Sequence, residues 1–184
     1  LATGDGDRAA LVAAFAEQVS AIAEGGADFI HSETMFDLDE AHAAVEGARA
    51  AADLPIVLTF SFDRGDPQKG YRTLMGVSPG RAAEAVAAMD LLAVGANCGR
   101  GLEGYERVLA DLAPAVPLVA KFNAGMPHIE GDRTVYDMAP AAMASYAGRA
   151  VELGARLVGA CCGSTPDHIL AIAAAIAMME GEAP

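Results

Sequence analysis

The sequence contains little positive charge and no long apolar run. Its 184 residues include 12 Lys and Arg against 25 Asp and Glu, a formal net charge of −13. Nucleic acids and anionic membranes are also negative, so this balance argues against non-specific binding to either. No uninterrupted apolar run approaches the roughly 20 residues that a membrane-spanning helix needs. We therefore expect neither nucleic acid nor a membrane as a partner.

Cysteine is also scarce. The chain has three cysteines, and two of them, Cys161 and Cys162, are adjacent. Neighbouring cysteines rarely pair with each other, and an odd number does not suit a disulfide framework. The first residues show neither the basic nor the apolar segment of a secretory signal. These features predict a reducing, cytoplasmic location.

Hydrophobic residues make up 53% of the chain and charged residues 20%, which excludes a disordered protein. Short apolar segments alternate with segments of helical periodicity. The predicted strands are 27–31, 54–60, 91–96, 118–121 and 157–160. The predicted helices are 8–24, 38–51, 78–89, 102–112, 139–153 and one beginning at 165. The intervening segments 63–77 and 122–136 are predicted as loops.

Five apolar strands separated by helices predict an α/β protein whose parallel sheet is buried on both faces. Two architectures fit this alternation: a doubly wound open sheet and a slice of a (β/α)₈ barrel. Periodicity does not choose between them. A whole barrel typically needs about 250 residues, so a barrel here would lack about three N-terminal βα units.

All three cysteines fall at predicted strand ends, where parallel sheets collect functional residues. Cys98 follows the third strand, and Cys161 and Cys162 follow the fifth. Three thiolates at one rim suit a catalytic Zn²⁺ site, which uses three protein ligands and keeps one position open. Two alternatives remain. The cysteines are small buried apolar residues, or the adjacent pair is a redox pair, although the usual Cys-x-x-Cys spacing is absent.

Two motifs carry a resemblance to a known family. Gly95-Ala96-Asn97-Cys98 and the segment 159–169, Gly-Ala-Cys-Cys-Gly-Ser-Thr-Pro-Asp-His-Ile, resemble the zinc motifs of the homocysteine S-methyltransferase family. The second motif of that family is usually Gly-Gly-Cys-Cys-Gly-Thr-Thr-Pro-Glu-His-Ile. This chain departs from it at Ala160, Ser164 and Asp167. Glu33-Thr34 and the segment 123–125, Asn-Ala-Gly, also match, so the resemblance covers nearly the whole chain.

The resemblance implies a (β/α)₈ TIM barrel with the cysteines at the ends of strands six and eight. The five strands would then be strands four to eight, with the N-terminal units missing. Residues 1–184 would form the C-terminal part of a single homocysteine-binding domain. Because five units do not close a barrel and open strand edges are costly, we expect either a longer native chain or self-association.

The same resemblance implies a zinc-dependent enzyme that moves a methyl group from a small donor to the thiolate of homocysteine, giving methionine. Cys98, Cys161 and Cys162 would hold Zn²⁺, which keeps a bound thiol deprotonated. Glu33 would receive the α-ammonium group of the substrate. Thr34, Asn97 and Asn123 are the further substrate-binding candidates.

Several alternatives to this function stay open. The chain could be a non-catalytic or truncated homocysteine- and zinc-binding module of a larger methionine synthase-type enzyme. It could also be an unrelated α/β protein with buried structural cysteines. The donor is not readable from the residues, since betaine, S-methylmethionine and methyl-corrinoids all serve this family. His168, in the first turn of the last helix, is predicted to cap or pack rather than to bind metal, and Thr165 to be the N-cap of that helix.

Overall fold

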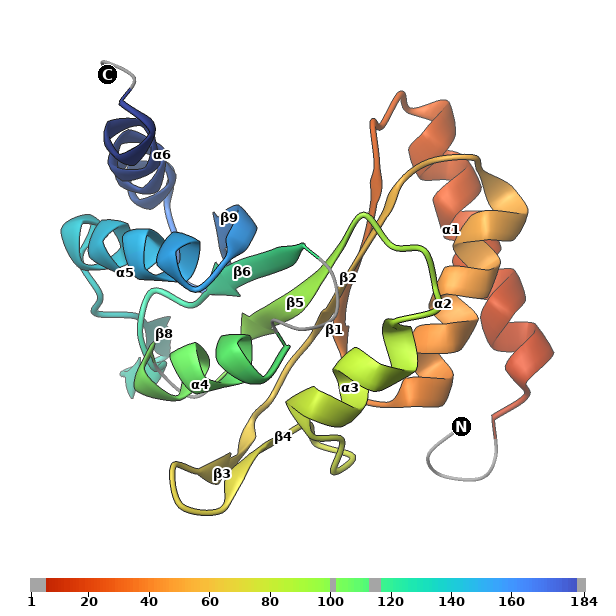
Figure 1. Ribbon diagram of the computed structural model, residues 1–184, viewed down its shortest axis with the longest axis horizontal. Helices are drawn as coiled ribbons and strands as arrows, with labels where there is room; N and C mark the ends of the chain where they lie inside the picture. Colours follow the sequence, from red (N-terminus) through yellow and green to blue (C-terminus); the bar gives the residue numbers. More distant parts are fainter. Residues whose placement is uncertain (1–5, 100–101, 113–116, 182–184) are drawn as a thin grey trace.

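The computed structural model describes residues 6–99, 102–112 and 117–181. Its centre is a parallel sheet in the order β1-β2-β5-β6-β9 (Figure 1). The five strands are β1 (Ile30–Met35), β2 (Ile56–Phe60), β5 (Ala93–Cys98), β6 (Leu118–Phe122) and β9 (Ala155–Ala160). The order of these five strands in the sheet is the same as their order in the sequence. Each connection between successive strands contains a helix. The predicted α/β class and parallel sheet are confirmed.

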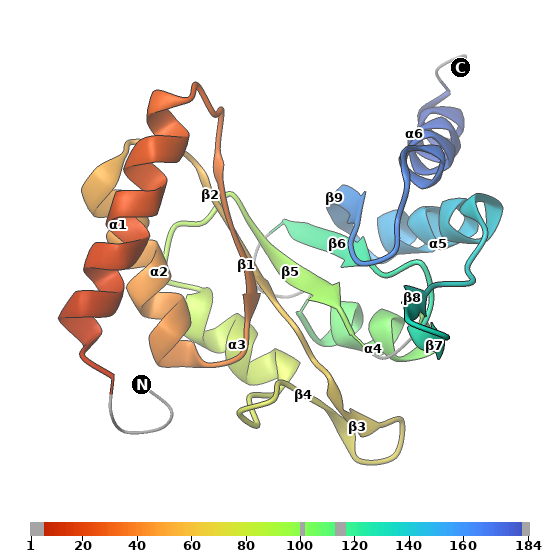
Figure 2. The same ribbon diagram turned by 180° about the vertical axis from the view of Figure 1, so that it is seen from behind.

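Six helices are described. They are α1 (Arg8–Glu24), α2 (Leu38–Ala51), α3 (Pro79–Val86), α4 (Leu102–Leu112), α5 (Pro140–Glu152) and α6 (Pro166–Glu180). Their starts have local causes: the side chains of Asp7, Asp37 and Ser78 accept backbone N–H groups of the first turns of α1, α2 and α3. The two pairs α1–α2 and α5–α6 pack side by side at opposite ends of the sheet (Figures 1 and 2).

The two faces of the sheet differ, because side chains alternate along each strand. Leu58, Val94 and Ala120 point into the main core, to which all six helices contribute. Their neighbours Val57, Ala93 and Val119 form a separate small cluster. That second face therefore lies away from the helices. It also carries the polar residues at odd-numbered positions of the strands, among them Glu33 on β1 and Lys121 on β6.

The burial of the strands follows their place in the sheet. The central strands β2, β5 and β6 are almost entirely buried, as predicted. The prediction of two buried faces is wrong for β1 and β9, whose residues are mostly intermediate or exposed. The reason is that both lie at the ends of the strand order and have one strand neighbour each.

Some predicted boundaries are also wrong. β1 starts at Ile30 instead of residue 27 and ends at Met35 instead of residue 31, and β5 extends to Cys98 instead of ending at residue 96. The two predicted loops contain short antiparallel hairpins. They are β3 (Arg64–Asp66) with β4 (Gly70–Arg72), and β7 (His128–Glu130) with β8 (Arg133–Val135). Both hairpins follow the carboxyl end of a sheet strand, the end at which the cysteines lie.

None of the helices in the described ranges combines the length and the apolar character needed to cross a bilayer.

Candidate metal centre

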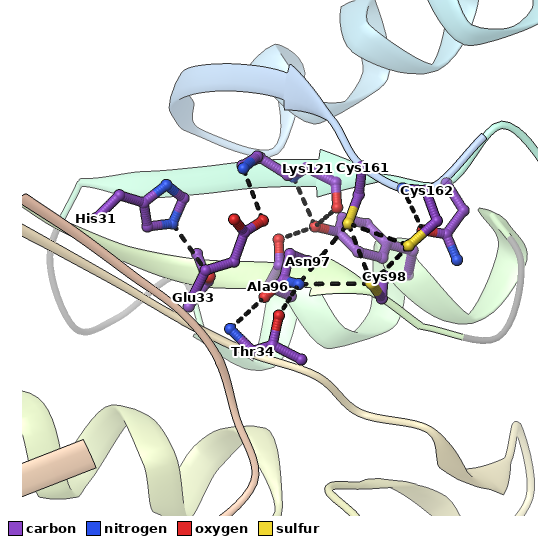
Figure 3. A network of polar contacts seen from close by, with 12 residues as sticks. His31, Glu33, Thr34, Ala96, Asn97, Cys98, Lys121, Cys161 and Cys162 are labelled. Carbon is purple, nitrogen blue, oxygen red and sulfur yellow. Dashed lines mark hydrogen bonds and ion pairs between the residues drawn. The ribbon is translucent and has the colours of Figure 1, made fainter. Parts of the chain in front are cut away.

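The three cysteines converge at the carboxyl ends of β5 and β9 (Figure 3). Cys98 is the last residue of β5, and Cys161 and Cys162 directly follow β9. The Sγ atom of Cys98 lies 3.1 Å from that of Cys161 and 3.7 Å from that of Cys162. The Sγ atoms of Cys161 and Cys162 are 3.8 Å apart, and all three thiols are free. The prediction that they gather at one place is confirmed.

This spacing suits a metal ion. Tetrahedral coordination at a Zn–S distance of about 2.3 Å places the sulfur ligands about 3.8 Å apart. Two of the three separations match that value, and the third is shorter. Among the described residues, these three form the group whose donor atoms lie close enough together to hold an ion. An all-sulfur donor set favours soft or borderline divalent ions over Mg²⁺ or Ca²⁺.

The contacts between the sulfur atoms change the pKa values of Cys98 and Cys161 in opposite directions. A hydrogen bond between the Cys98 and Cys161 sulfur atoms, together with one from the Asn97 amide, lowers the pKa of Cys161 to about 5. The same hydrogen bond, reinforced by burial, raises the pKa of Cys98. This arrangement favours the thiolate form at Cys161 over that at Cys98. The thiolate is the form that binds metals.

Asn97 connects this cluster to β1. Its side chain is fully buried, and its Nδ2 lies 3.5 Å from the Sγ atom of Cys98 and 3.9 Å from that of Cys161. Its Oδ1 accepts the backbone N–H of Thr34 at 3.0 Å, and its Nδ2 donates to the Thr34 hydroxyl at 2.7 Å. Thr34 and Cys98 both have positive φ, 68° and 58°, which non-glycine residues rarely adopt. The backbone therefore has an unusual conformation both at Thr34, to which Asn97 is hydrogen-bonded, and at Cys98, which follows Asn97 in the chain.

Glu33 lies on the same face of the sheet and is paired with a lysine. The Nζ atom of Lys121, on β6, is 2.6 Å from Glu33 Oε1 (Figure 3). Next to them, His31 Nε2 lies 3.1 Å from the hydroxyl of Thr59. Burial, and to a lesser extent the Lys121 ammonium, lowers the pKa of His31, which keeps the imidazole neutral at neutral pH. The candidate Glu33 is therefore an ion-paired carboxylate.

Asn123 reaches the other side of the cysteine cluster. It follows β6, and its Oδ1 accepts the backbone N–H of Cys162 at 3.2 Å. The nearby Gly163 has φ +79°, and a Cβ atom there would lie 2.1 Å from the Tyr136 ring. The second cysteine motif thus needs glycine at this position, both for its backbone conformation and for the close approach of Tyr136.

Sequence reasoning missed two residues of this region, Lys121 and Tyr105. The Tyr105 hydroxyl, from α4, donates to the Ala96 carbonyl and accepts the Lys121 N–H at 2.8 Å, so it joins β5 to β6 beneath the site. The position of Lys121 at the end of a predicted strand was a signal for it. The partners of Tyr105 lie far from it in sequence, and no local pattern points to them.

His168 has the role predicted for it. Its Nδ1 accepts the backbone N–H of Thr165 at 3.1 Å, and its Nε2 lies 2.8 Å from the Met138 carbonyl. Since Nδ1 accepts, Nε2 carries the proton and donates to that carbonyl. His168 therefore caps α6 and ties it to the segment before α5.

One protein family matches the chain over most of its length. The family model described as homocysteine S-methyltransferase matches residues 2–176. The chain belongs to the homocysteine S-methyltransferase family. Within the family, it is 33% identical over 172 residues to the methionine synthases of Mycobacterium leprae (strain TN) and Mycobacterium tuberculosis (strain ATCC 25618 / H37Rv). Each alignment covers 89% of this chain and 14% of the methionine synthase.

Solved structures of a homocysteine methyltransferase also match this chain. The apo form of the homocysteine methyltransferase MmuM from Escherichia coli matches with a TM-score of 0.71 and 25% identity, over 94% of this chain and 59% of MmuM. The metallated form of MmuM matches with a TM-score of 0.66 and 28% identity, over 89% of this chain and 51% of MmuM. This family member thus spans a small part of the methionine synthases and about half of MmuM.

Proposed function

We propose that this chain binds zinc through Cys98, Cys161 and Cys162 and transfers a methyl group from a small donor to homocysteine, giving methionine. The observation that carries the proposal is the cluster of three sulfur atoms, 3.1 to 3.8 Å apart, on the sheet face that also carries Glu33. Support comes from the family and from the structural likeness to a metallated homocysteine methyltransferase.

The chemistry of the donor set fits zinc. Cys98, Cys161 and Cys162 would hold the ion, and bound zinc would keep the sulfur of the substrate deprotonated at neutral pH, where a free thiol of pKa about 8.5 is mostly protonated. The chain's own residues supply position and charge. Glu33 accepts the α-ammonium group of the substrate as a charged hydrogen bond. Asn97 holds Thr34, next to Glu33, in a fixed relation to Cys98 and Cys161.

Thr34 and Asn123 complete the proposed site. The Thr34 backbone turns at positive φ directly after Glu33, and Asn97 holds it there through two hydrogen bonds. Asn123 anchors the backbone of Cys162 from the end of β6. Such supporting hydrogen bonds orient the groups that touch the metal and the substrate.

For the domain, we propose that β1, β2, β5, β6 and β9 correspond to strands four to eight of a (β/α)₈ barrel. The family resemblance places the cysteines at the ends of strands six and eight. Here they lie at the carboxyl ends of β5 and β9, which are separated by one strand, β6. On this assignment, the residues 1–184 are the C-terminal part of one homocysteine-binding domain. Further βα units or a second copy of the chain would cover the edges β1 and β9.

A second candidate is a zinc- and homocysteine-binding module without activity of its own. It is favoured by the small share of the methionine synthases, 14%, that the chain spans. The site would then bind the thiol while other parts of a larger enzyme deliver the methyl group.

One experiment separates these candidates. The zinc content of the purified chain is measured, and methionine formation is followed with betaine, S-methylmethionine and a methyl-corrinoid in turn. The proposal predicts about one zinc per chain, its loss in Cys98→Ser, and methionine from at least one donor. Ser164→Ala, a change in the same loop that removes no sulfur, should keep the zinc. Zinc and homocysteine binding without methionine favours the module, and absence of zinc from the wild type contradicts both.

A further inference from the structure

Lys121 occupies a central place on the sheet face that carries the cysteine cluster. In the register of the sheet it lies between Asn97 on β5 and Gly159 on β9. A Cβ atom on Gly159 would lie 3.4 Å from Lys121 Cγ, so the lysine stem extends over this glycine. The side chain then reaches across the face to Glu33 on β1. This path places an ammonium group in the middle of the candidate site.

The ion pair of Lys121 and Glu33 is open to exchange. The side chains of Lys121 and Glu33 are 22% and 35% exposed, so a solute reaches both charges. A lysine ammonium has three donors. In the described part of the chain, it makes one side-chain hydrogen bond, to Glu33. The neighbouring His31 is neutral and adds no second cation.

A cavity of about 280 Å³ lies against Lys121. Lys121, His31 and Gly159 line it together with the apolar side chains of Val57 and Val119. Cys161 lies two residues beyond Gly159, directly after the end of β9. The lining of this cavity therefore ends beside the cysteine cluster.

We propose that Lys121 is a specificity residue that binds the α-carboxylate of the thiol substrate while Glu33 binds its α-ammonium group. This inference rests on the proposed function and names the substrate class as α-amino acids with a side-chain thiol. A zwitterion inserted between the two side chains replaces one ion pair with two. The net charge of the site is then unchanged. A thiol without the carboxylate breaks the pair and leaves Lys121 without an anion.

The test uses three thiols and the zinc-loaded full chain. The thiols are homocysteine, 3-aminopropane-1-thiol, which lacks the carboxylate, and 4-sulfanylbutanoate, which lacks the amine. Dissociation constants are measured by calorimetry for the wild type, Lys121→Met, Lys121→Arg and Glu33→Gln. Zinc content and thermal unfolding of each variant establish that the metal centre and the fold are retained.

The proposal predicts a crossed pattern. Lys121→Met weakens homocysteine and 4-sulfanylbutanoate by about ten- to a hundredfold, the range of a charged hydrogen bond. It does not weaken 3-aminopropane-1-thiol, which no longer has to break the ion pair. Lys121→Arg restores most of the loss, because it keeps the positive charge. Glu33→Gln weakens homocysteine and 3-aminopropane-1-thiol and does not weaken 4-sulfanylbutanoate, which no longer has to break the ion pair.

Other outcomes contradict the proposal in distinguishable ways. If Lys121→Met weakens all three thiols equally, the lysine only positions Glu33, and the carboxylate role is wrong while the proposed function stands. The same holds if the wild type binds homocysteine no better than 3-aminopropane-1-thiol. If the zinc-loaded wild type binds none of the thiols, the proposed function itself is wrong.

Discussion

Asn97 and Thr34 exchange two hydrogen bonds across the carboxyl end of β2, although 63 residues separate them in sequence. The Asn97 amide also faces the sulfur atoms of Cys98 and Cys161. Glu33, the carboxylate proposed to bind the substrate ammonium, directly precedes Thr34. One buried amide therefore fixes the distance between the sulfur cluster and the proposed ammonium site.

Replacing Asn97 with alanine should affect both stability and metal binding. The change leaves the Thr34 N–H without its partner and removes a group that orients two ligands. We expect the free energy of unfolding to fall by about 1–3 kcal/mol. We expect zinc affinity to fall by about 10–100-fold. Chemical denaturation and competition with a zinc chelator measure the two effects.

A matched control for this prediction is Thr73→Ala. Thr73 is also fully buried, and its hydroxyl bridges the Phe36 carbonyl and the Val77 N–H, with no cysteine among its partners. It should lose a similar amount of stability and keep its zinc affinity. Equal zinc affinities in Asn97→Ala and Thr73→Ala would show that Asn97 does not support the metal centre.

The sequence allowed the cysteine cluster to be predicted because parallel strands end at one rim, so residues at strand ends meet whatever their separation in the chain. Cys98 and Cys161 are such a pair. Lys121 needed more information, since its partner Glu33 is 88 residues away in sequence and lies on a strand that is not a neighbour of β6. Tyr105 needed still more, because a helix must dock before its hydroxyl finds Ala96. The hairpins were missed because strands of three residues carry too little alternation to detect.

The depressed pKa of His31 predicts a pH dependence of stability. Burial, chiefly, disfavours the charged imidazole in the folded state, whereas in the unfolded chain its pKa is 6.5. The unfolded state therefore binds more protons as the pH falls below 6.5, and the folded state is destabilised there. We expect this contribution to be fully present above pH 6.5 and to be lost as the pH falls through the lower folded-state value.

The measurement is the free energy of unfolding between pH 5 and 8 for the wild type and His31→Gln. The glutamine variant should show a shallower decline below pH 6.5. Thr59→Val removes the hydroxyl that contacts His31 but keeps the titrating group, so its pH profile should keep the slope of the wild type. A His31→Gln profile parallel to the wild type would contradict the assignment.

Gly95 is required by the packing of β5 against β6. A Cβ atom there would lie 1.7 Å from the Val119 carbonyl oxygen, a backbone atom that a rotamer change does not move. We expect Gly95→Ala to destabilise the protein by about 3 kcal/mol or more, or to prevent folding. Gly80, in α3, has no atom within 4 Å of a Cβ position. Gly80→Ala should instead stabilise by about 0.4–1 kcal/mol. Thermal unfolding of both variants tests the contrast, and a well-folded Gly95→Ala protein would contradict the close approach.

Zinc should stabilise the fold through the cysteine cluster alone. Because binding to the folded state adds RT ln(1 + [Zn²⁺]/Kd), a hundredfold excess over Kd raises the free energy of unfolding by about 2.7 kcal/mol. The gain should disappear with a chelator and be much smaller in Cys98→Ser, which loses the sulfur that contacts both others. Mg²⁺ is the matched control, since thiolates bind it poorly, and it should not change the unfolding transition. A zinc effect that survives in Cys98→Ser, or that Mg²⁺ reproduces, would place the stabilising ion elsewhere on this acidic chain.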